Sequence, residues 1–120
     1  MDALLVGVGA FFGGVSRYAI GKLLARSDFP WATVVINLSG SFLLGVVAAV
    51  WAKDHPLRLL LGIGCLGGYT TFSTFSLELL EQLRSNQPVL ALLNLAIQVM
   101  GGVLVCALGY ALGSKFPVSG

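Results

Sequence analysis

The chain has 120 residues, of which 57% are hydrophobic and 10% are charged, and its formal net charge at pH 7 is +2. This composition is typical of a membrane protein rather than a soluble domain. The basic residues are scattered and form no basic run, which argues against a nucleic-acid partner. We therefore predict an all-α membrane protein in direct contact with the lipid bilayer.

Four apolar segments are long enough to cross a bilayer, which takes about 20 residues of helix. They cover residues 3–24, 31–52, 57–83 and 89–113. Asp2 stands where a cleavable signal would carry basic residues, so we expect the first segment to remain as a span. Each connection ends in a proline at the first turn of the next helix, at Pro30, Pro56 and Pro88. The prediction is a single four-helix transmembrane domain over residues 1–120.

The third segment is interrupted near its middle by Gly-Gly-Tyr-Thr-Thr-Phe-Ser-Thr-Phe, residues 67–75. Its two glycines and two threonines predict a break in the helix at residues 67–71. Each unpaired backbone group in lipid costs several kcal/mol, so a break persists only where the freed groups face protein, water or an ion. This segment is therefore the first candidate for a permeation or ion-binding site.

Neutral hydrogen-bonding side chains lie within the spans. They are Asn37 in the second segment, Thr70, Thr71, Ser73 and Thr74 around the break, and Asn94 and Gln98 on one face of the fourth segment. For Asn94 and Gln98, bonding between helices is the favoured interpretation. For Asn37 and the hydroxyl cluster we favour a pathway, because so many hydroxyls beside a break exceed what joining helices requires.

Three further side chains suggest an ion path. Arg17 lies deep in the first segment, where it either snorkels to the interface or concentrates anions in a vestibule. Phe72 and Phe75 share a helix face directly after the break. A ring edge attracts a small anion and a ring face attracts a cation, and the spacing leaves open which part the path would meet.

The sequence lacks the groups that proton coupling, nucleophilic catalysis or metal binding by side chains would need. The five acidic residues lie at segment ends, in loops or on the exit half of the third segment, and the lone histidine, His55, is in a loop. A proton-coupled transporter usually holds a titratable group at mid-membrane. Cys65 and Cys106 lie in apolar segments and behave as small hydrophobic residues. Because the chain has neither a nucleophile–base pair nor a His/Cys ligand cluster, we predict that it is not an enzyme.

The distribution of basic residues gives little indication of how the chain is oriented in the membrane. With four spans, both termini lie on one membrane face. That face collects Lys53, Arg58 and Lys115, and the other collects Lys22, Arg26 and Arg84, together with Arg17 if its side chain snorkels outward. The positive-inside rule has little to act on. Either a weak bias still sets one orientation, or the chain inserts both ways and forms an antiparallel dimer with a two-fold axis in the membrane plane.

Glycines at GxxxG spacing allow close helix contact. The pairs are Gly9 with Gly13, Gly64 with Gly68, and Gly109 with Gly113. Four thin helices cannot easily enclose an aqueous path, so the pattern favours homo-oligomerisation. The alternative is that these glycines pack only within one subunit.

Three motifs resemble those of the CrcB/Fluc fluoride channels. They are Gly-Gly-x-x-Arg-Tyr at 13–18, Asn-x-x-Gly-Ser-Phe at 37–42 and Gly-x-x-Gly-Gly-x-Thr-Thr-Phe-Ser-Thr-Phe at 64–75. The resemblance covers essentially the whole chain. It implies a dual-topology homodimer in the cell (inner) membrane with two passive, fluoride-selective pores that export fluoride from the cytoplasm.

The resemblance also implies roles for individual residues. A structural Na⁺ at the dimer centre would be held by the backbone carbonyls of Gly67 and Thr70 from both subunits. Fluoride would meet the ring edges of Phe72 and Phe75. The remaining pore residues would be Asn37 as a hydrogen-bond donor, Ser73 and Thr74 as nearby polar groups, and Arg17 toward a vestibule. The family's polar track on the fourth helix is less sharply patterned here, and Asn94 or Gln98 could belong to it.

Two alternatives belong to other classes of protein. A small multidrug-resistance exporter also has four spans and antiparallel dimers, but it needs a membrane carboxylate in its first helix, where this chain has Arg17 and no acid. A non-transporting membrane scaffold would use its polar residues only to join helices. The hydroxyl-rich run at residues 70–75 argues against a scaffold, because joining helices requires no break.

Overall fold

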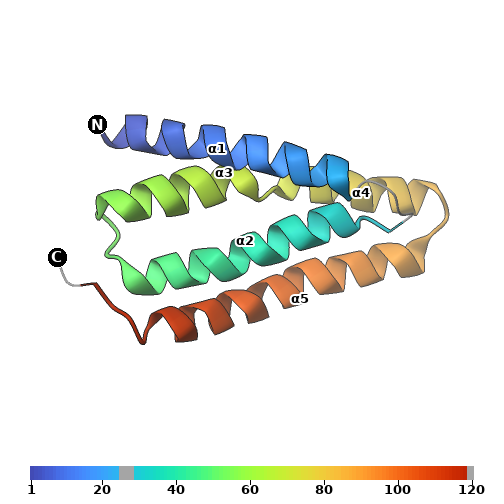
Figure 1. Cartoon of the computed structure of the whole chain (residues 1–120). Coiled ribbons are helices and arrows are strands. Elements are labelled where there is room, and N and C mark those ends of the chain that lie inside the picture. Colours follow the sequence, from blue (N-terminus) through green and yellow to red (C-terminus); the bar gives the residue numbers. More distant parts are fainter. Residues whose placement is uncertain (25–28, 119–120) are drawn as a thin grey trace.

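Four helical passes lie side by side, and the N-terminus of α1 is at the same end of the bundle as the C-terminus of α5 (Figure 1). The computed structural model describes residues 1–24 and 29–118. The connection at residues 25–28 lies outside the described residues, and with it Arg26 of the charge comparison. The chain measures 52 Å along its longest axis. A bilayer with its headgroups is about 40–45 Å thick, so each pass has the length of a membrane span.

The first, second and fourth passes are continuous helices: α1 covers Asp2–Leu23, α2 covers Trp31–Val50 and α5 covers Pro88–Gly113. Each is long and apolar enough to cross a membrane. A helix satisfies its backbone groups internally, which is why apolar segments take this form in lipid. Pro88 begins α5 as predicted, whereas Pro30 stands one residue before α2.

The third pass is divided. It contains the π-helical segment η1 (Arg58–Leu66), the single turn α3 (Gly67–Tyr69) and the helix α4 (Phe72–Arg84). No one piece spans a membrane alone. The predicted all-helical fold with four passes and a broken third helix is confirmed, and the described residues contain no strand.

The turn from α4 into α5 is formed by local signals. Asn86 has a φ of 56°, the left-handed conformation that asparagine tolerates. The amide of Asn86 donates to the carbonyl of Leu83, and the amide of Gln87 donates to the carbonyl of Gln82. These two bonds close α4 as a Schellman motif and direct the chain into α5.

The glycine pairs mediate packing within this chain. Gly9 and Gly13 face the backbone of η1, and Gly64 and Gly68 face the backbone of α1, so closely that an added Cβ would collide. Gly109 and Gly113 lie in the same way against α2. Close packing of backbones is what small residues allow in membranes. These glycine pairs therefore pack within one chain, and they give no support to homo-oligomerisation.

Candidate functional site

The break in the third pass is two residues long. Thr70 and Thr71 have extended backbones, with ψ angles of 155° and 115°. Helix α4 then begins at Phe72, and the Thr71 hydroxyl accepts a hydrogen bond from the amide of Thr74 at 3.2 Å. That contact is an N-cap, which satisfies one free donor of the new helix. The break is shorter than predicted, because Gly67 remains helical with φ −62° and ψ −39°.

Asn37 on α2 holds the backbone of the break. Its Nδ2 donates to the carbonyl of Thr71 at 3.1 Å, and its Oδ1 accepts from the amide of the same residue at 2.8 Å. An extended residue in lipid would otherwise leave both groups unpaired. One amide side chain therefore replaces the helical bonds that the break removes.

A row of amide side chains continues from Asn37 away from the break. Asn37 donates to Gln98 at 2.6 Å, Gln98 donates to Asn94 at 2.7 Å, and Asn94 donates to Gln82 at 3.4 Å. Asn94 is completely buried, and Gln98 and Gln82 are buried as well. We call Asn37, Gln98, Asn94 and Gln82 the amide row. Gln82 was not singled out from the sequence, because its position opposite Asn94 depends on how α4 packs on α5.

Carbonyl groups at the carboxyl end of α3 lose their usual helical partners where the helix stops, whereas that of Leu66 keeps its partner. The carbonyl of Leu66 accepts from the amide and the hydroxyl of Thr70. The carbonyl of Gly68 accepts from Arg17 Nε at 3.3 Å. Among the hydrogen bonds within the described residues outside the regular helices, none ends on the carbonyl of Gly67 or Thr70. Gly67 is also exposed.

These two carbonyls suit a hard cation. Carbonyl oxygens are the ligands that such ions prefer, and the carboxyl end of a helix carries partial negative charge. The residues present therefore fit the Na⁺ site predicted at Gly67 and Thr70. The described residues contain no group of three or more His, Cys, Asp or Glu side chains that could hold a metal ion.

Phe72 and Phe75 begin α4 and differ sharply in exposure. Phe75 is 4% exposed and Phe72 is 78% exposed. Their ring centroids lie 6.0 Å apart in an edge-on arrangement with an interplanar angle of 65°. The structure thus brings the two predicted rings together, with one in the core of the chain and the other projecting from its surface.

Two hollows flank the break. One of about 230 Å³ lies on the side of α5 and is lined by Asn37, Phe72, Phe75 and Gln98, among others. The other, of about 330 Å³, lies between α1, α2 and α4 and includes Arg17, Lys22, Thr33 and Thr74 in its lining. The first hollow presents amides and aromatic rings, and the second carries two positive charges. We call the second one the cationic hollow.

The hydroxyls after the break form one cluster. The hydroxyls of Thr71 and Ser73 are 3.3 Å apart, and Thr71 donates to Thr74 at 3.2 Å. Ser73 is exposed and Thr74 is half-buried. The two predicted polar groups therefore lie on the first turn of α4, with Thr74 facing the cationic hollow.

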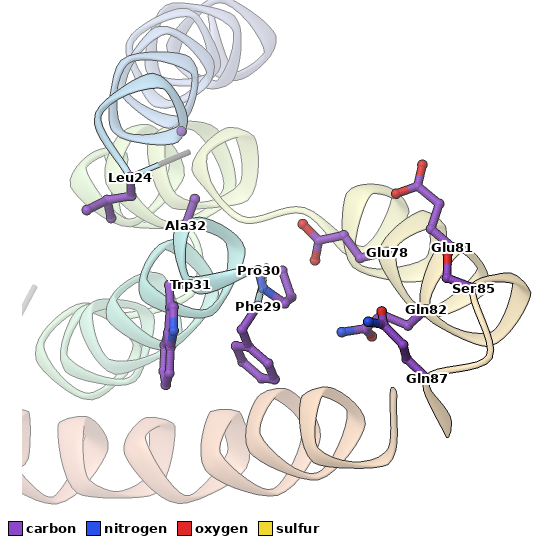
Figure 2. Close-up of a pocket in the computed structure, with 11 residues that line it drawn as sticks. Leu24, Phe29, Pro30, Trp31, Ala32, Glu78, Glu81, Gln82, Ser85 and Gln87 are labelled. Atoms are coloured by element: carbon purple, nitrogen blue, oxygen red, sulfur yellow. The ribbon is translucent and has the colours of Figure 1, made fainter. Parts of the chain in front are cut away.

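A third hollow, of about 480 Å³, opens where α4 meets the start of α2, and Glu78, Gln82 and Gln87 are among the side chains that line it (Figure 2). The hydroxyl of Thr33 donates to Glu78. Glu78 Oε1 and Gln82 Nε2 are buried without a hydrogen-bond partner in the part of the chain that the structure describes. The amide row therefore ends on a free donor at this hollow.

Comparison with known proteins gives a consistent result. The family described as CrcB-like protein, Camphor Resistance (CrcB), matches residues 4–110. A protein of Rhodopseudomonas palustris named fluoride-specific ion channel FluC 1 is 38% identical, over 92% of this chain and 85% of its own length. Proteins of Erythrobacter litoralis (FluC) and Geobacillus kaustophilus (FluC 1) carry the same channel name. Their identities are 40% and 39%, over 94% and 92% of this chain and 92% and 96% of their own lengths.

Proposed function

We propose that this chain, which belongs to the CrcB-like protein family, forms a passive channel that is selective for fluoride. The family match confirms the resemblance carried by the three motifs, and relatives named as ion channels agree with the expectation that the chain is not an enzyme. The chain is a multi-pass membrane protein. The single observation that carries the proposal is the two-residue break held by Asn37, from which a row of amide donors leads to a hollow.

The chemistry of the site suits a small, strongly hydrated anion. Such an ion leaves water only if donors replace its hydration shell, and the break offers amide N–H groups, hydroxyls and the positive edges of rings. Asn37, Ser73 and Thr74 supply the polar groups, and Phe72 and Phe75 supply the ring edges. Gln98 and Asn94 extend the amide donors along α5, and Arg17 with Lys22 gives the cationic hollow a charge that attracts anions.

A passive mechanism is supported by the side chains between the break and the far hollow. The side chains that join the break to the far hollow are neutral amides, which carry no proton that transport could exchange. Fluoride that accumulates in the cytoplasm when HF enters and dissociates would leave down its own gradient. In the cell (inner) membrane, such export lowers fluoride toxicity.

The functional unit that we propose is an antiparallel homodimer. In a single chain Phe72 is 78% exposed, so its ring borders an open surface rather than a closed path. A second copy packed against this surface would enclose the ring. The near balance of basic residues between the two membrane faces supports insertion in both orientations. A cysteine placed at Lys53, in a chain without Cys65 and Cys106, should then react with impermeant reagents from both faces, and reaction from one face alone would rule out dual insertion.

Na⁺ is the cofactor that we propose, held by the carbonyls of Gly67 and Thr70. Gly67 is exposed and Thr70 is half-buried, and neither carbonyl accepts a hydrogen bond outside the regular helices of the described residues, which supports an ion shared between two copies. The bound ion would supply a positive charge that compensates the unpaired carbonyls of the two broken helices. Its role is structural, and it is not transported.

Growth in fluoride tests the function in cells. A bacterial strain without its own fluoride export should grow at elevated fluoride when it produces this chain. The same strain producing Phe75→Ile at equal membrane abundance should remain sensitive. If both strains are equally sensitive while the wild-type chain is present in the membrane, fluoride export is not its function.

A further inference from the structure

We infer that Arg17 is a positioning residue that anchors the carboxyl end of α3, where the break begins. Its effect on transport rests on the proposed function, but the anchor itself does not. The sequence alone suggested two roles for Arg17, snorkelling to the interface or attracting anions. The structure adds a contact that neither role includes, from Arg17 Nε to the carbonyl of Gly68 at 3.3 Å.

The Gly68 carbonyl, which Arg17 contacts, needs a hydrogen-bond donor. Gly68 lies in the last turn before the break, so its carbonyl has no helical amide to accept from. A guanidinium is well suited to this position, because the carboxyl end of a helix carries partial negative charge and a charged donor forms a stronger hydrogen bond than a neutral one. Arg17 is half-buried, which reduces the competition from water.

The packing of α1 explains why Arg17 reaches this carbonyl. Gly9, Gly13 and Arg17 follow one another at i, i+4 and i+8, and therefore share one face of α1. A Cβ on Gly13 would collide with the carbonyl of Cys65, and a Cβ on Gly68 would approach the backbone of Ala10 to 2.9 Å. The two glycines bring the helices so close that the next side chain on this face, Arg17, lies at the end of α3.

Lys22 provides an internal comparison. It lines the same cationic hollow as Arg17 and carries the same charge. Its Nζ lies 5.6 Å from the centre of the Tyr18 ring, and no hydrogen bond among those of the described residues joins it to the break. If the cationic hollow needed only positive charge, the two residues would be equivalent. The contact with Gly68 belongs to Arg17 alone.

The carbonyls at the break have two different cationic partners in this proposal, the Arg17 guanidinium and the proposed Na⁺. Arg17 binds the carbonyl of Gly68, while the carbonyls of Gly67 and Thr70 accept no hydrogen bond outside the regular helices of the described residues. When Arg17 releases Gly68, the last turn of α3 loses the contact that fixes its direction. The two carbonyls available to a bound cation would then lose their alignment.

The test compares Arg17→Lys with Lys22→Gln. Arg17→Lys keeps the charge but removes the planar donor group. We expect the Thr70 amide, which bonds the carbonyl of Leu66, to exchange its hydrogen about tenfold faster in this variant, as the loss of one charged hydrogen bond implies. Fluoride efflux from liposomes should fall about tenfold as well, and the Na⁺ concentration for half-maximal efflux should rise. Lys22→Gln should leave exchange and the Na⁺ requirement unchanged.

Wild-type amide exchange and efflux in Arg17→Lys would overturn the anchor, and so would a lowered Na⁺ requirement. The Nε–H of Arg17 gives a second test that needs no substitution. In wild-type protein it should exchange with water more slowly than the Nε–H of the exposed Arg84, and equal rates would contradict the contact. If the wild-type chain carries no fluoride at all, the proposed function fails, and the two exchange measurements still decide the anchor.

Discussion

Asn37 and Thr71 exchange two hydrogen bonds across 34 residues of sequence: Asn37 Nδ2 donates to the Thr71 carbonyl, and the Thr71 amide donates to Asn37 Oδ1. The pairing is the one a helix would have made for this residue, transferred to a side chain. It lets the third pass change direction inside the membrane without an unpaired group at Thr71. The same amide also begins the row that leads along α5.

Asn37→Asp tests this pairing. A carboxylate can still accept from the Thr71 amide but cannot donate to the Thr71 carbonyl or to Gln98 Oε1. We expect fluoride efflux to fall at least about tenfold and the unfolding free energy to fall by about 1–3 kcal/mol for each of the two acceptors that lose their donor. Ser39→Ala is the control, because Ser39 pairs with the Tyr69 hydroxyl and not with the extended residues. Wild-type efflux in Asn37→Asp would contradict the role of the amide.

Substitution of the two phenylalanines should affect fluoride efflux and folding stability differently. Replacement by Ile keeps much of the bulk and removes the positive ring edge. Phe72→Ile should lower fluoride efflux with little change in the folding stability of the single chain, because the side chain is exposed there. Phe75→Ile should lower efflux and also destabilise the fold by about 1–3 kcal/mol, as shape changes in a packed core do.

Phe11→Ile is the matched control for the rings, since Phe11 is an exposed aromatic on α1 that lines neither hollow at the break. Its efflux should equal that of the wild type. If Phe72→Ile and Phe75→Ile both conduct as well as this control, the ring edges have no part in conduction.

The fold was predictable where local signals decide it. The four apolar segments and the threonines at the break are visible in the sequence, and both features are confirmed. The glycines at 67 and 68 were misread as part of the break. Gly67 is helical, and Gly68 is a glycine because α1 passes too close for a Cβ. A glycine that breaks a helix and a glycine that allows two helices to pack closely look the same in the sequence, and only the packing distinguishes them.

The site was less predictable, because its contacts join residues that are distant in sequence. Arg17 and Gly68 are 51 residues apart, and Asn37 and Gln98 are 61 apart. Local sequence patterns do not indicate which faces of two helices pack against each other. Gln82 was overlooked for this reason, and because it lies next to Glu81 and close to Arg84 it looks like an ordinary solvent-facing side chain in the sequence. The π-helical turn of η1 has no local signature that we can identify.

The amide row predicts a loss of conduction in Gln98→Leu. The apolar side chain would leave Asn94 Oδ1 without its donor and interrupt the row next to the break. We expect fluoride efflux to fall by at least about tenfold, because both hydrogen bonds that Gln98 makes in the row are lost. Met100→Leu, an exposed position on the same helix, should conduct normally. Equal efflux from the two variants would remove the row from the pathway.

Removal of Na⁺ tests the proposed cofactor. Replacement of Na⁺ by N-methylglucamine on both sides of a liposome should abolish fluoride efflux and favour dissociation of the dimer, because four carbonyls of two helix ends would lose their compensating charge. Restored Na⁺ should restore efflux. Undiminished efflux from a folded dimer after prolonged dialysis without Na⁺ would show that the carbonyls of Gly67 and Thr70 need no ion.

Anion efflux from liposomes that contain the purified chain tests the central claim most directly. Fluoride and chloride electrodes would record both anions in parallel, in Na⁺ buffer and without a proton gradient. We predict fast fluoride efflux and no chloride efflux above that of empty liposomes. Efflux of both anions, or no fluoride efflux from folded protein, would contradict a passive fluoride-selective channel.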